Sequence, residues 1–74
     1  MTKSFHITDH AKGQMEERGI IPVNCPLYQV KEMIYDQITT NNTNIYESLR
    51  SIIYIVDNIE YIFKRNTLIT AIKH

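Results

Sequence analysis

The spacing of apolar residues predicts a short helix near the start of the chain. An apolar side chain recurs every four residues, at Ile7, Ala11 and Met15. This spacing places the three side chains on one face of a helix, where they can pack against the rest of the protein. Thr8 can serve as the N-cap, and Gly19 can end the helix in a left-handed conformation. We therefore expect a helix over residues 8–18.

A second helical pattern follows a connector that contains two prolines. Pro26 suits the first turn of a helix, because proline lacks the backbone N–H that would be unpaired there. The expected buried face consists of residues at helical spacing, Leu27, Val30, Ile34 and Ile38. The polar residues 39–44 are typical of a loop, so the predicted helix covers residues 27–38.

The second half of the chain has the composition typical of β-strands, with turn-forming residues between the strand-like runs. Asp57-Asn58 separates two runs rich in β-branched residues, which is typical of a hairpin, and Arg65-Asn66 is expected to form the next turn. Four strands are expected, over residues 45–50, 51–56, 59–64 and 67–72. The order of elements predicts a single α+β domain spanning residues 1–74. Its two N-terminal helices should pack on one face of a three- to four-stranded antiparallel sheet.

The strand pattern also suggests which side chains share a face of this sheet. If both turns have two residues, cross-strand partners lie on the same face. We expect the helices to cover the aliphatic face, which carries Ile53, Ile55 and Ile62. The opposite face would then bring together four polar-tipped side chains, Arg50, Tyr54, Tyr61 and Thr70.

Composition and charge bear on the expected location of the protein and on its expected partners. The 74 residues contain no apolar run long enough to cross a bilayer, and the single Cys25 cannot form an internal disulfide, so we expect a cytoplasmic protein. A dedicated nucleic-acid binder is usually basic, whereas the formal net charge is zero. Any RNA contact therefore depends on where the Lys and Arg residues cluster. A chain this small is also expected to form a homodimer or to have one face covered by a partner.

A polar stripe runs beside the apolar stripe of the first predicted helix and consists of His10, Gln14 and Arg18. Near the N-terminus of a helix the dipole favours the neutral form of His10, which can accept a proton. Arg18 supplies a cation suited to a phosphate group. The alternative interpretation is that His10 caps the helix locally or packs at the edge of the core. Arg18 would then form a solvent-exposed pair with Gln14 or a neighbouring acid.

Other kinds of chemistry find less support in the sequence. His6 and His10 have the spacing of two metal ligands on a helix, but no third ligand completes the set. Cys25 lies in the connector, where a lone cysteine is more often a packing residue than a nucleophile. The chain has only two glycines and no glycine-rich phosphate loop. The sequence predicts neither a metal site nor a bound cofactor.

The first predicted helix resembles the opening motif of a known family. His10-Ala11, Met15 and the run 17–20 are similar to the HA-x-x-x-M-x-x-R-G-I opening of a small bacterial and phage domain family of otherwise unknown function. That family is grouped with the RelE-like toxins, in the wider barnase–EndoU–colicin–RelE ribonuclease fold. The resemblance implicates His10 and Arg18, together with Thr70 from the last strand. The family often has an additional arginine where this chain has Gly13-Gln14.

The sequence and the resemblance together lead to the hypothesis of a RelE-like, metal-independent ribonuclease, acting as a toxin or phage-encoded effector. His10 would be the base or a phosphate contact, Arg18 and Arg50 would stabilise charge, Tyr61 would stack or donate a proton, and Thr70 would orient the substrate. The expected partners are RNA and a cognate antitoxin or target protein. The competing hypothesis is a non-catalytic protein-binding module of phage or mobile-element origin that inhibits a host or immune protein.

Overall fold

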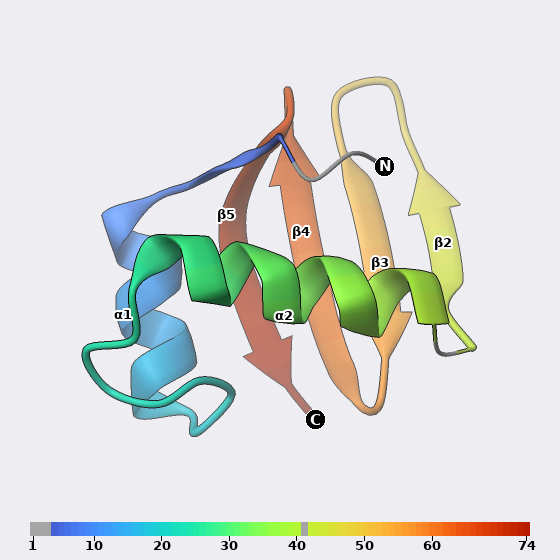
Figure 1. Cartoon of the computed structure of the whole chain (residues 1–74). Helices are drawn as coiled ribbons and strands as arrows, with labels where there is room; N and C mark the ends of the chain where they lie inside the picture. The colour runs from blue at the N-terminus through green and yellow to red at the C-terminus, as the bar shows by residue number, and fades with distance from the viewer. Residues whose placement is uncertain (1–3, 41) are drawn as a thin grey trace.

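A computed structural model of the chain describes residues 4–40 and 42–74, which form two helices and one five-stranded sheet (Figure 1). The helices are α1 (Asp9–Glu17) and α2 (Leu27–Thr40). The strands are β1 (His6–Ile7), β2 (Asn44–Glu47), β3 (Ile52–Val56), β4 (Ile59–Lys64) and β5 (Thr67–Lys73). Their order in the sheet is β1-β5-β4-β3-β2. The predicted α+β class with two helices is confirmed, whereas β1 precedes the helices and was not expected.

The sheet differs from the expected one because it is mixed and has an additional strand. β1 pairs with β5 in parallel, whereas the other neighbouring strands are antiparallel. The His6 amide donates to the Asn66 carbonyl at 3.0 Å, and the Thr8 amide donates to the Leu68 carbonyl at 3.1 Å. β1 has only two residues, so no alternation of apolar and polar positions could reveal it.

The ends of α1 agree with the cues in the sequence. The Thr8 hydroxyl accepts a hydrogen bond from the Ala11 amide at 3.0 Å, which is the N-cap arrangement. Gly19 has a φ of 70°, the left-handed conformation that ends many helices. Ala11 and Met15 are fully buried. In Figure 1, α1 lies beside the β5 edge of the sheet, and α2 crosses one face.

Both predicted hairpin turns are present. Asp57 and Asn58 have φ values of 50° and 64°, and Arg65 and Asn66 have values of 49° and 62°. Two consecutive positive φ angles are what a type I′ turn requires, and this turn matches the twist of the paired strands. The expected strand over residues 45–50 is shorter, because β2 ends at Glu47 and residues 48–51 form the loop to β3.

The prediction of which sheet face the helices cover is wrong. The buried side chains of β3, β4 and β5 belong to the other face, and they are Tyr54, Val56, Ile59, Tyr61, Phe63, Leu68 and Ala71. Ile53, Ile55 and Ile62 are half-buried and share the face opposite α2. The aromatic face forms the core because its rings fill the space under α2, where Val30, Ile34 and Ile38 are also buried. Leu27, expected in that stripe, is 45% exposed.

A β-bulge explains why Thr70 does not join Tyr61 on one face. Ile62 pairs with Thr70 and Phe63 pairs with Leu68, which leaves Ile69 as an extra residue in β5. One extra residue moves every following side chain to the opposite face. Ala71 therefore lies opposite Tyr61, and Thr70 lies on the face away from α2. The expected convergence of Arg50, Tyr54, Tyr61 and Thr70 does not occur.

Among the described residues, neither helix has the length and hydropathy needed to span a lipid bilayer.

Candidate functional site

Two hydrogen bonds join the polar stripe of α1 to the last strand. The Thr70 hydroxyl donates to the side-chain oxygen of Gln14, and Nη1 of Arg18 donates to the backbone carbonyl of Ala71. α1 can approach β5 this closely because Ala11 and Met15 direct their apolar face into the core. The structure therefore brings Arg18 and Thr70, which are far apart in the sequence, to one helix–strand junction.

His10 lies in the first turn of α1 and is exposed to solvent. Within residues 4–40 and 42–74 its imidazole forms no hydrogen bond or ion pair. Neither ring nitrogen is engaged by the described part of the protein, so both are available to a ligand. The alternative interpretation that His10 packs at the edge of the core does not hold, because the side chain faces outward.

The outer face of α1 forms a shallow cleft of about 320 Å³. Six residues line it, and they are Asp9, His10, Gly13, Gln14, Glu17 and Arg18. Gly13 lies between His10 and Glu17 along the helix surface, because the three residues are at positions i, i+3 and i+7. A Cβ placed on Gly13 would meet no other atom within 4 Å. The absence of a side chain at Gly13 therefore keeps the middle of the cleft open.

Glu17 was not among the predicted site residues, although its spacing from His10 places the two on one face of α1. Glu17 lies seven residues after His10, which corresponds to two helical turns and about 10 Å along the axis. An imidazole and a carboxylate at the two ends of one cleft can act as a proton-transfer pair. The guanidinium of Arg18 has five N–H donors, so its bond to the Ala71 carbonyl leaves donors for an anion.

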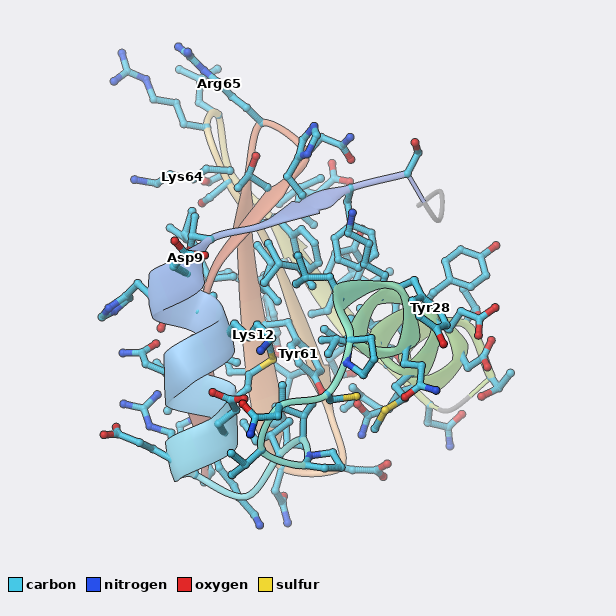
Figure 2. All side chains as sticks on the ribbon, turned by 60° about the vertical axis from the view of Figure 1, so that its left-hand side comes forward. Asp9, Lys12, Tyr28, Tyr61, Lys64 and Arg65 are labelled. Atoms are coloured by element: carbon cyan, nitrogen blue, oxygen red, sulfur yellow. The ribbon has the colours of Figure 1, made fainter. Side chains whose placement is uncertain are left out.

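Tyr61 lies in the core and not at the surface. Its side chain is 1% exposed, and its hydroxyl donates to Oε1 of Gln37 on α2 at 2.5 Å. Burial raises the pKa of Tyr61 to about 12, and the negative charge of Asp57 adds to the shift. Figure 2 shows Tyr61 inside the molecule, whereas Tyr28 points from α2 into solvent. Tyr61 has no exposed ring on which a base could stack, and we leave it out of the site.

Arg50 is also separate from the α1–β5 junction. It lies in the loop between β2 and β3, at the opposite edge of the sheet, and it is exposed. Of the five residues selected from the sequence, the structure thus brings three to one side of the molecule, His10, Arg18 and Thr70. In the described part of the chain, no group of three or more His, Cys, Asp or Glu side chains could hold a metal ion.

Comparisons with protein-family models, with curated proteins and with solved structures found no match to this chain.

Proposed function

We propose that this chain is a metal-independent ribonuclease of RelE-like type, which acts in the cytoplasm as a toxin or phage-encoded effector. The observation that carries the proposal is the α1–β5 junction. There, the bonds Thr70–Gln14 and Arg18–Ala71 fix the polar stripe of α1 against the last strand. His10 stands at the open end of the same stripe with both ring nitrogens unengaged by the described residues.

RNA cleavage without a metal needs two proton transfers and a site for negative charge. One group removes the proton from a ribose 2′-hydroxyl, and the 2′-oxygen then attacks the adjacent phosphorus. The bond from phosphorus to the 5′-oxygen breaks, a 2′,3′-cyclic phosphate forms, and a second group protonates the departing oxygen. In our proposal His10 and Glu17 are this pair, and Arg18 stabilises the charge that develops on the phosphoryl oxygens.

The remaining residues of the junction position this machinery. Thr70 and Gln14 hold the middle of α1 on β5. The carbonyl of Ala71 orients the guanidinium of Arg18, because one of its N–H groups is committed to that bond. Gly13 leaves the space in which the phosphodiester would lie between His10 and Glu17.

The direct test is RNA cleavage by the purified protein in the presence of a metal chelator. Wild-type protein should cleave RNA, and its expression should arrest bacterial growth. His10→Ala and Glu17→Gln should each lower the cleavage rate by about 100-fold or more, which is typical for loss of a general acid or base. Glu32→Gln, an exposed change on α2, is the matched control and should retain full activity. Absence of cleavage by the wild type, or equal cleavage by all variants, would refute the proposal.

A second function, a non-catalytic module that binds an antitoxin or target protein, is favoured by one observation. All four residues of β2 are exposed, and Ile45 and Tyr46 are 55% and 56% exposed. β2 is an edge strand, so its outward backbone groups can pair with a strand of another protein or of a second copy. Tyr46→Lys should block such pairing. If it abolishes the growth effect while His10→Ala does not, the binding module replaces the nuclease.

A further inference from the structure

A larger cavity lies at the end of the sheet where the β2–β3 loop meets the β4–β5 turn. Its volume is about 750 Å³, which is within the range of roughly 300–1,000 Å³ typical of small-molecule sites. Arg50 contributes to it from the β2–β3 loop, and Arg65 contributes from the β4–β5 turn. α2 crosses the sheet away from this end (Figure 1).

The floor of the cavity is apolar and is held in place by contacts between aromatic rings. Tyr54 and Phe63 line it, and their rings meet edge to face with centroids 5.5 Å apart. Phe5 also packs against Phe63 in a second edge-to-face contact, with ring centroids 5.2 Å apart. Tyr54 and Phe63 are 8% and 5% exposed, so the core holds both rings in place and only a small part of each residue borders the cavity. Half-buried Ile52 completes this floor.

The polar wall of the cavity carries two guanidinium groups on short, well-defined turns. Arg65 has a φ of 49° in its tight hairpin turn, and the next residue, Asn66, donates from its side chain to the Ser4 carbonyl at 2.6 Å. The loop that carries Arg50 is closed by the Ser48 and Ser51 hydroxyls, which lie 2.7 Å apart. Neither guanidinium forms an ion pair or hydrogen bond with the described residues.

Charge is also unevenly distributed along the sheet, although the chain as a whole is neutral. Arg50, Lys64 and Arg65 lie at this end, and Figure 2 shows Lys64 and Arg65 there, beyond the N-terminal end of α1. Glu47 is the single acidic residue that lines the cavity. Two arginines from different loops are suited to one phosphate group, because each planar guanidinium can donate two parallel hydrogen bonds to its oxygens.

We infer that this cavity binds a ribonucleotide. The phosphate of the nucleotide lies between Arg50 and Arg65, and its nucleobase lies against the apolar floor formed by Ile52, Tyr54 and Phe63. Glu47, at the rim, accepts hydrogen bonds from the ribose hydroxyls. The inference does not depend on the nuclease proposal, because the cavity and the α1 cleft share no lining residue. An inorganic anion would contact the arginines alone and would leave the apolar floor of the cavity exposed to water.

The test is a titration of the isotope-labelled chain with the four ribonucleoside 5′-monophosphates, followed by amide NMR shifts. We expect saturable binding in the micromolar to low-millimolar range, with the largest shifts at residues 47–52 and 63–66. Arg50→Gln and Arg65→Gln should each weaken binding by about tenfold, since each removes one charge-assisted contact. Lys73→Gln removes a cation from the opposite end of β5 and should bind as the wild type does. Circular dichroism confirms that each variant is folded.

Three results would overturn the inference. The first is the absence of saturable shifts with any of the four nucleotides. The second is unchanged affinity in folded Arg50→Gln and Arg65→Gln. The third is equal affinity for inorganic phosphate and for a nucleotide, which would show that the apolar floor of the cavity takes no part in binding. The RNA cleavage of the His10 variant is measured separately, so failure of this site and failure of the nuclease proposal give different results.

Discussion

Thr70 on β5 donates a hydrogen bond to Gln14 on α1, and this bond joins the last strand to the first helix across 56 positions of the sequence. It depends on the β-bulge at Ile69, which turns Thr70 out of the core. The amide side chain of Gln14 thus makes the contact from α1 to the strand, and Arg18 follows directly after α1 as its C-cap residue.

We expect the Gln14–Thr70 bond to contribute measurably to stability. Thr70→Val keeps the shape of the side chain and removes the donor, and it should lower the free energy of unfolding by about 1 kcal/mol. Gln14→Ala should cost a similar amount. Because both changes break the same bond, the double variant should be more stable than the sum predicts, by about 0.5 kcal/mol or more. Urea denaturation of the four proteins gives these values. Strict additivity would show that the bond contributes nothing.

Gly13→Ala separates stability from activity in the α1 cleft. Alanine is favoured over glycine in a helix by about 1 kcal/mol, and the added Cβ meets no atom within 4 Å, so the free energy of unfolding should rise. The same methyl group would occupy the floor of the cleft between His10 and Glu17. We therefore expect RNA cleavage to fall severalfold while the melting temperature increases. Unchanged cleavage in the more stable variant would show that Gly13 does not border the substrate.

Tyr61 should make the protein sensitive to alkali. Its pKa is raised from 10.0 to about 12 by burial, so between these pH values the folded state keeps a proton that the unfolded state has lost. Stability is therefore fully present below pH 10 and falls as the pH rises, by about 1.4 kcal/mol per pH unit. Tyr61→Phe, which cannot ionise, should lose about 1 kcal/mol less than wild type between pH 9 and pH 11. Equal losses in both proteins would exclude Tyr61 as the cause.

The Asp57-Asn58 turn allows a test of backbone conformation alone. Asn58 has a φ of 64°, which glycine adopts without steric cost and a β-branched residue does not. Asn58→Gly should leave stability unchanged or raise it slightly, whereas Asn58→Val should lower the free energy of unfolding by about 1–2 kcal/mol. Thermal denaturation compares the two. A valine variant as stable as the glycine variant would mean that the turn relaxes to a different conformation.

The sequence by itself determined the features that depend on a few neighbouring residues. Thr8 and Gly19 mark the ends of α1 because a helix end is capped by residues within one turn of it. The Asp57-Asn58 and Arg65-Asn66 turns were predictable for the same reason, since their conformation is set locally. The polar stripe of α1 was also visible, and Glu17 could have been added to it from its spacing.

The tertiary structure alone decided which face of the sheet became the core. Periodicity separates two faces but does not say which one a helix covers, and Tyr61 can be buried because Gln37 of α2 supplies a partner for its hydroxyl. One extra residue, Ile69, then placed Thr70 on the opposite face and beside Gln14. The cavity with Arg50 and Arg65 likewise required two separate loops to meet in space. These outcomes depend on contacts between residues far apart in the chain, which no local pattern encodes.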